Sequence, residues 1–194
     1  MIVDTRGKSC PEPVIITKKA LEDTTNDKLV IYVDSEVSKE NILRYLDSAG
    51  AKGKVQEKAG YSEIIVEISQ TQQTSNTINK TIKKGLIYYI SSDAAGSGDC
   101  ELGQKLMVNM ISTIEKLDYL PELMFFINTG IYLTTLNENT IVPLKKLTDN
   151  GVKIYTCGTC LNYFKLENTL KVGQVTDMFS LLTALTSAHN IIKL

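Results

Sequence analysis

The sequence lacks tryptophan and has a single histidine among its 194 residues. With one imidazole, histidine-based acid–base or nucleophilic chemistry has little to draw on. No apolar run reaches the roughly 18 residues that a membrane-spanning helix needs, and the N-terminus does not show the basic and then apolar pattern of a secretory signal. We therefore expect a soluble cytoplasmic protein with no membrane partner.

An excess of charge of one sign is also missing. Lys and Arg total 21, Asp and Glu total 22, and the formal net charge is −1. Neither half of the chain is basic, so a dedicated nucleic-acid surface is not expected. The 4 cysteines do not make a disulfide framework for a chain of this length. In a reducing compartment they are better explained as metal ligands or redox thiols.

The stretch Cys10–Pro13, with the sequence Cys-Pro-Glu-Pro, follows an extended run and precedes a helical pattern. Because proline is favoured at the first position of a helix, we predict Cys10 at the N-cap and Pro11 at N1. A thiol placed there faces free N–H groups and the positive end of the helix dipole, which lowers its pKa and favours the reactive thiolate. Arg6 and Lys8 would act in the same direction. The local residues leave a buried, inert cysteine open as the alternative.

The first 69 residues predict the element order strand, helix, strand, helix, strand, strand. Gly50 is expected to end the second helix, whose N-cap we place at Ser38, and residues 59–61 are expected to form a hairpin turn. Both helices should cover one face of a four-stranded sheet. The expected segments are 2–5, 11–23, 29–33, 38–49, 54–58 and 62–68.

A spaced motif runs through the start of this region and consists of Asp4, Gly7, Cys10, Pro11 and Pro13. The motif resembles the signature of the TusA/SirA family of small sulfur carriers, and the element order resembles the two-layer α/β sandwich of that family. The resemblance implies that Cys10 carries sulfane sulfur as a persulfide, supported by the two prolines. We interpret Asp4 as an acceptor that organises the loop and Gly7 as a requirement of backbone geometry.

Residues 70–83 begin with a stretch that is wholly polar up to residue 77 and are expected to be a linker. A complete α/β pattern restarts afterwards, which favours two domains, 1–69 and 84–194. A long surface loop within one domain is the alternative.

Residues 84–194 alternate between expected strands and helices, a pattern typical of a doubly wound parallel sheet. Asp99 is the expected N-cap of the first helix, on which Gly103 would mark close packing. The glycines at 96 and 98 do not complete a dinucleotide-binding fingerprint. The expected strands are 86–90, 123–128, 152–155 and 191–192. The expected helices start at 99, 140 and 175 or 176, and the core face of the first carries Leu102, Leu106, Met110 and Leu117.

Cys157 and Cys160 form a C-x-x-C pair directly after an expected strand. In sheets of this kind, ligands and reactive groups lie at the carboxyl ends of the strands. Three interpretations stay open: half of a zinc site that needs two more ligands, a thioredoxin-like dithiol, or a sulfur-handling pair in which one thiol accepts and the other resolves. Cys100, in the first turn of an expected helix, is interpreted as structural.

Residues 84–194 resemble the DsrE-like family through the segments 102–106, 128–130 and 151–157. That resemblance implies that Cys157 is the reactive cysteine and Cys160 its partner. It also implies a homo-oligomer, because DsrE-like domains commonly assemble. Together with the segment 172–178, the combination of both domains resembles the YedF-like family, which is linked by name to selenium metabolism.

The leading hypothesis is a sulfur or selenium carrier, or a sulfurtransferase, that passes persulfide from Cys10 to Cys157 and Cys160. Its partners would be a cysteine desulfurase-type donor and a downstream sulfur or selenium acceptor protein. We expect no cofactor and no metal. Two alternatives are a non-catalytic redox or regulatory interaction protein, and a C-x-x-C dithiol reductase that does not need Cys10.

Overall fold

The structure is a computed structural model that describes residues 1–9, 11–24, 26–68 and 81–194. The chain divides into two compact units, Met1–Thr77 and Ile78–Leu194. Most of the expected linker lies outside the described residues, and its last residues, 81–83, belong to a strand. Within the described ranges, no helix is long and apolar enough to cross a bilayer.

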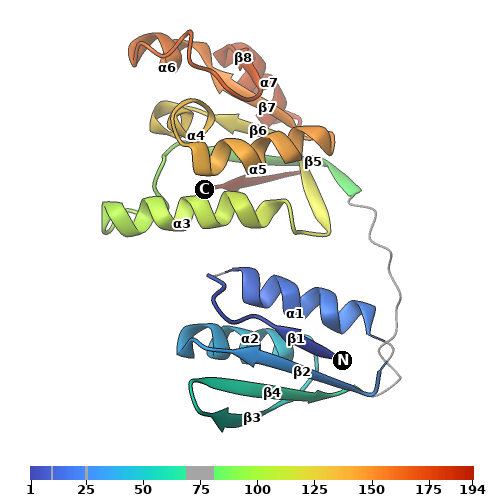
Figure 1. The fold of residues 1–194 in the computed structure, drawn as a ribbon. Helices are drawn as coiled ribbons and strands as arrows, with labels where there is room; N and C mark the ends of the chain where they lie inside the picture. The colour runs from blue at the N-terminus through green and yellow to red at the C-terminus, as the bar shows by residue number, and fades with distance from the viewer. Residues whose placement is uncertain (10, 25, 69–80) are drawn as a thin grey trace. The chain divides into compact units, whose positions relative to one another are not determined.

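The N-terminal unit is a four-stranded sheet with the strand order β1-β2-β4-β3. β1 runs parallel to β2, and the two remaining pairs are antiparallel. Both helices lie on the same face of the sheet (Figure 1), so the expected two-layer sandwich and its element order are confirmed. The elements are β1 (Ile2–Asp4), α1 (Glu12–Asp23), β2 (Lys28–Val33), α2 (Glu36–Ser48), β3 (Gly53–Lys58) and β4 (Tyr61–Glu67).

The core of this unit follows from the alternation of side chains along β2 and β4. Every second residue of β2 is buried against the helices, while the residues between them are only partly covered. A strand with this alternation has one face on the core and one toward solvent. The buried apolar side chains of the central strands are Leu29, Ile31, Val33, Ile64 and Val66, and the helices add Ala20, Ile42 and Leu46.

The ends of α2 show one correct and one wrong prediction. Gly50 has a φ of 74°, and its N–H donates to the Asp47 carbonyl while the Ala51 N–H donates to the Leu46 carbonyl. This is a Schellman-type end that needs a left-handed residue, as expected of Gly50. The N-cap, however, is Ser35, because its Oγ accepts from the Ser38 N–H at 3.5 Å, and Ser38 lies inside the helix.

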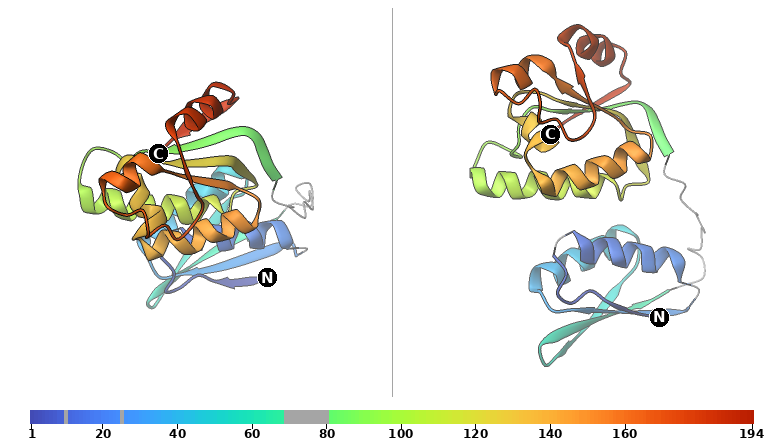
Figure 2. Two further views of the ribbon diagram at one scale, coloured as in Figure 1. Left: turned by 90° about the horizontal axis from the view of Figure 1, so that it is seen from above. Right: turned by 45° about the horizontal axis from the view of Figure 1, so that its top comes forward.

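The C-terminal unit is a five-stranded, wholly parallel sheet with the order β8-β7-β6-β5-β9. The helices α3 and α5 cover one face and α7 lies on the other (Figures 1 and 2), which confirms a doubly wound fold. The elements are β5 (Thr81–Ile90), α3 (Cys100–Ile114), β6 (Tyr119–Phe126), the 3-10 helix η2 (Asn128–Ile131), α4 (Tyr132–Thr135), α5 (Glu138–Asp149), β7 (Lys153–Cys157), α6 (Gly158–Tyr163), β8 (Gln174–Thr176), α7 (Met178–Thr186) and β9 (Asn190–Lys193).

Several boundaries in this unit differ from the sequence-based ones. β5 begins at Thr81 rather than at residue 86, and a register shift between Lys83 and Ile87 joins its two parts. Val175 and Thr176 form strand β8 instead of opening the last helix, which starts at Met178 with Asp177 as its N-cap. Two β-branched residues at the sheet edge favour a strand, and the aspartate after them is the stronger helix start.

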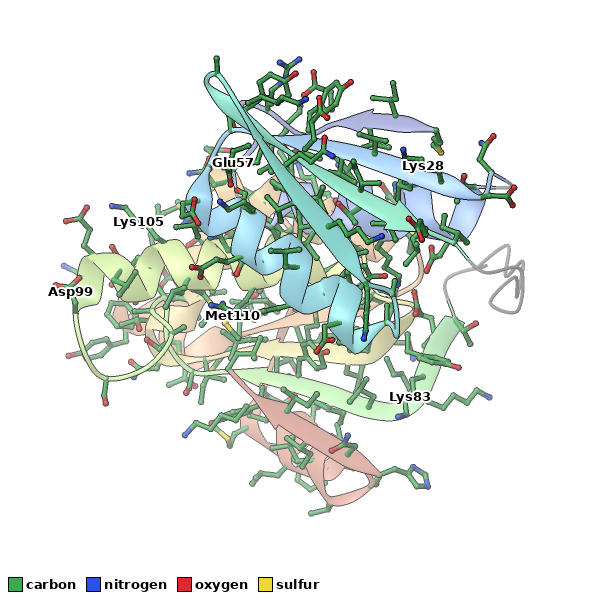
Figure 3. The ribbon with its side chains drawn as sticks, turned by 90° about the horizontal axis from the view of Figure 1, so that it is seen from below. Lys28, Glu57, Lys83, Asp99, Lys105 and Met110 are labelled. Atoms are coloured by element: carbon green, nitrogen blue, oxygen red, sulfur yellow. The ribbon has the colours of Figure 1, made fainter. Side chains whose placement is uncertain are left out.

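The core face of α3 was assigned to the wrong side of the helix. Leu102, Leu106 and Met110 are exposed, as is Leu117, which follows the end of α3, and the buried residues of the helix are Gly103, Met107, Ile111 and Ile114. The helix carries apolar residues on two sides, so periodicity alone does not choose between them. Gly103 decides the orientation, because a Cβ there would lie 3.0 Å from Ala94 Cβ and 3.1 Å from the Ala95 carbonyl oxygen. Met110 and Lys105, both labelled in Figure 3, belong to the exposed side.

We expect Met107→Ala to destabilise the C-terminal unit by about 2–5 kcal/mol, because it opens a cavity in the core. Met110→Ala is the matched control on the same helix and should change stability by less than about 1 kcal/mol. Met107 is 0% exposed and Met110 is 37% exposed. Urea denaturation of both variants measures the difference, and equal losses would contradict this orientation of α3.

Candidate functional sites

The first site surrounds the loop between β1 and α1. Cys10 lies outside the described residues, so the site is defined here by its neighbours. α1 begins at Glu12, with Pro11 in the cap position and a buried Pro13 in the first turn. The helix therefore starts one residue later than predicted, and Pro11 is the residue before the helix rather than N1. The Glu12 N–H donates to the Ser9 carbonyl at 2.9 Å and closes the turn that leads into the helix.

Asp4 and Arg6 form a two-pronged ion pair in this loop. The Arg6 Nε and terminal nitrogen donate to the two Asp4 carboxylate oxygens at 2.9 and 2.6 Å, and the Arg6 backbone N–H donates at 3.1 Å. These hydrogen bonds lower the pKa of Asp4 to about 2. The Arg6 guanidinium also lies over the rings of Tyr32 and Tyr61, 5.4 and 5.0 Å from their centroids.

The rest of the loop is fastened to β2 and the residue that follows it. The Gly7 N–H donates to Asp34 Oδ2 at 2.8 Å, at a φ of 69° that disfavours residues with a side chain. The Thr5 N–H and Oγ1 both donate to the Tyr32 carbonyl, at 2.9 and 2.7 Å. Each residue from 4 to 7 thus makes a hydrogen bond that restricts the loop. The restricted loop in turn positions the start of α1.

The two basic residues near Cys10 are already paired. Arg6 binds Asp4, and Lys8 Nζ lies 3.9 Å from Glu12 Oε2. A cation with a carboxylate at its side has a weaker field at a distance than a free one. The two side chains therefore add less positive potential at the start of α1 than unpaired cations would.

We expect Asp4 to titrate near pH 2 rather than at its usual 3.8. Its folded pKa is depressed, so the stabilisation from the pair is present above the unfolded value and is lost as the pH falls through about 2. NMR titration of the Asp4 carboxyl carbon measures this. Arg6→Gln should move the midpoint back toward the usual value, and an unchanged midpoint in that variant would contradict the assigned cause.

The second site lies at the carboxyl end of β7. Cys157 is the last residue of this strand and the N-cap residue of α6, and Cys160 lies in the first turn of that helix. Cys157 is only 4% exposed, whereas Cys160 is half-buried. Both are free thiols. The pair therefore stands at the sheet edge where reactive groups of doubly wound folds are found, as the strand pattern predicted.

The Cys160 sulfur has a backbone donor from the 3-10 helix that follows the neighbouring strand β6. The Asn128 N–H lies 3.2 Å from Cys160 Sγ, and Asn128 adopts a φ of 48°. Burial and a hydrogen bond with Cys157 raise the pKa of the Cys160 thiol, and the Asn128 N–H opposes that shift.

The turn that carries Asn128 is held against the end of β5. The Ile127 N–H donates to the Ile90 carbonyl at 2.9 Å, and the Asp93 N–H donates to Thr129 Oγ1 at 3.3 Å. A Cβ at Gly130 would lie 2.6 Å from the same Ile90 oxygen, so no larger residue fits there. The absence of a side chain at residue 130 thus fixes how closely η2 approaches β5 and where the Asn128 N–H points.

We expect Gly130→Ala to destabilise the C-terminal unit by about 1–3 kcal/mol, because the added methyl group forces η2 away from β5. The same shift should remove the Asn128 donor and change the alkylation rate of Cys160. Gly98→Ala is the control, since a Cβ at Gly98 meets nothing within 4 Å. Thermal unfolding and the alkylation rate of Cys160 are measured in both variants. Wild-type stability and alkylation in Gly130→Ala would contradict the role of this close approach.

Other candidate chemistry finds less support. Among the described residues, which do not include Cys10, no group of three or more His, Cys, Asp or Glu could hold a metal ion. Cys100, interpreted as structural, is exposed at the start of α3. His189 is also exposed, and its ring lies against Gly85, where a Cβ would meet Nδ1 at 2.2 Å.

Residues 1–68 match the model of the family described as sulfurtransferase TusA. The N-terminal unit belongs to the TusA family. A SirA-like protein from Desulfitobacterium hafniense is similar to this region, at 30% identity over 36% of this chain and 100% of its own, with a TM-score of 0.33. The ychN protein from E. coli is similar at 15% identity over 56% of this chain and 97% of its own, with a TM-score of 0.38. No curated protein matches.

Sequence reasoning missed two contacts that shape these sites. The stacking of Arg6 on Tyr32 and Tyr61 joins residues far apart in the chain, and no local pattern indicates it. The Asn128 donor had a partial signal. Asparagine followed by Thr-Gly at the end of a strand is typical of a turn with a left-handed residue, but its sulfur partner, Cys160, lies in helix α6.

Proposed function

We propose that this protein is a sulfur carrier or sulfurtransferase in which Cys10 takes up sulfane sulfur and passes it to the Cys157/Cys160 pair. The observation that carries the proposal is the TusA family match over residues 1–68, which includes the Cys10–Pro13 motif. A cysteine desulfurase-type protein would supply the sulfur. The setting would be the reducing cytoplasm, where thiols persist.

The chemistry needs an accessible thiolate at residue 10. The Cys10 thiolate would attack the outer sulfur of the donor persulfide, the bond between the two sulfurs would break, and the donor cysteine would leave as a thiolate. The product is a persulfide on Cys10. The ordered loop and the start of α1 support this role, because free N–H groups at a helix start favour an anionic sulfur.

The properties of the C-terminal cysteine pair support its role as a second sulfur-accepting site. Cys157 and Cys160 are free, hydrogen-bonded to each other and located at the carboxyl edge of a parallel sheet. Selenium in the same oxidation state follows the same route in this proposal, which accords with the resemblance to the YedF-like family. The final partner would be a downstream sulfur or selenium acceptor protein.

The homo-oligomer implied by the DsrE resemblance also stays a proposal. Its support is an apolar group of side chains on α7, where Met178, Phe179 and Leu182 are exposed and Phe179 reaches 81%. Clustered exposed apolar residues are typical of an association surface.

A dithiol reductase centred on Cys157 and Cys160 is the second candidate. The hydrogen bond between the two thiols favours it, because adjacent thiols can form a disulfide as they reduce a substrate. This function would not involve Cys10.

Mass spectrometry after incubation with a cysteine desulfurase and cysteine tests the leading proposal. We expect Cys10 to gain one sulfur atom, followed by a gain on the Cys157/Cys160 pair. Cys10→Ser should abolish both gains, because the first acceptor is lost. Cys100→Ser is the control and should leave them intact. If no cysteine of the wild-type chain gains a sulfur atom, the proposal is contradicted.

Reduction of insulin disulfides by the wild type and by Cys10→Ser separates the two candidates. Equal, rapid turnover by both, with no sulfur gain on Cys10, would favour the reductase.

A further inference from the structure

We infer that Cys160 is the thiol that receives sulfur in the C-terminal unit and that Cys157 is the thiol that resolves it. This order is the reverse of the one that the DsrE resemblance implies. The inference rests on the proposed function, since it names the receiving atom of the same transfer. It is argued from burial, from the backbone donor at Cys160 and from the contact between the two thiols.

Access differs between the two cysteines. Cys157 ends a buried strand and is 4% exposed, so its sulfur is shielded from a large partner. Cys160 follows within the first turn of α6 and is half-buried. An acceptor thiolate must approach the outer sulfur of a persulfide that is itself bound to a protein, and the rate of such exchange depends on access. Cys160 meets this requirement better.

The Asn128 N–H distinguishes Cys160 in a second way. It is directed at Cys160 Sγ at 3.2 Å, and the contacts of η2 with β5 hold it in place. Hydrogen bonds from fixed backbone N–H groups stabilise negative charge as it develops on a reacting atom. A thiolate needs this stabilisation when it forms before attack. Among the described residues, no backbone N–H donates to the Cys157 sulfur.

The contact between the thiols gives Cys157 its role. Cys157 is the buried N-cap residue of α6 and Cys160 is the third residue of that helix, so the two thiols are three positions apart at one helix start and can meet. A buried thiol next to a persulfide is suited to attack the inner sulfur. Burial and this contact raise the pKa of Cys160. The Asn128 N–H opposes this rise in the pKa of Cys160 and so favours the attacking thiolate.

The sulfur transfer and its release take two steps. The Cys160 thiolate attacks the outer sulfur of the Cys10 persulfide, and Cys10 leaves as a thiolate. The Cys157 thiolate then attacks Cys160 Sγ, the Cys157–Cys160 disulfide forms, and hydrosulfide leaves. The sulfane sulfur is reduced to sulfide while the two thiols are oxidised. An external dithiol reductant then restores both thiols.

Single variants in a full-length Cys10→Ser/Cys100→Ser background test the order, with glutathione persulfide as the sulfur source. We expect the added Cys157→Ser variant to gain one sulfur on Cys160 and to retain it without releasing sulfide. The added Cys160→Ser variant should load Cys157 more than about tenfold slower. Fast loading of Cys157, sulfide release without Cys157, or no loading of either variant would overturn the inference.

Alkylation of the reduced wild-type chain gives a test that needs no variant. Peptide mapping at limiting iodoacetamide should find Cys160 modified at least about tenfold faster than Cys157. Earlier modification of Cys157 would overturn the assigned order. Neither test involves Cys10. If a desulfurase does not load Cys10 but glutathione persulfide loads Cys160, the proposed function is contradicted and the order of the two thiols is not.

Discussion

The C-terminal site depends on one steric constraint, the close approach of Gly130 to the Ile90 carbonyl. This approach brings η2 against the end of β5 and directs the Asn128 N–H toward the end of β7. In a parallel sheet, neighbouring strands end at the same edge, so a turn after one strand can serve a side chain that follows the next. The thiol pair and its donor are thus joined through the sheet and not through the local sequence.

The N-terminal site is organised by charge pairing instead of close packing. Asp4 accepts three hydrogen bonds from Arg6, and the guanidinium covers two tyrosine rings at the same time. The pair is solvent-exposed, so its value is geometric and small in free energy. It restricts the loop that leads into α1 and engages the Arg6 guanidinium away from the helix start.

Much of this architecture could be predicted from the sequence, because it rests on local signals. Alternation in β2 and β4, the left-handed Gly50 and the aspartate before α3 each act within a few residues. The error in α3 has a tertiary origin. α3 has two apolar sides, and only the tertiary contact of Gly103 with residues 94 and 95 shows which is buried. Likewise, the C-x-x-C spacing indicates a reactive pair, but relative burial of Cys157 and Cys160 requires the position of neighbouring strands.

The donor at residue 128 is a main-chain group, and this has a consequence for how the site tolerates genetic change. A substitution at residue 128 leaves the N–H in place, provided that the new residue accepts a left-handed backbone, as glycine does. The sensitive position is residue 130, which touches neither sulfur. A mutational scan would therefore report that residue 128 accepts only residues that adopt a left-handed backbone, whatever their side chains, and that residue 130 accepts only glycine.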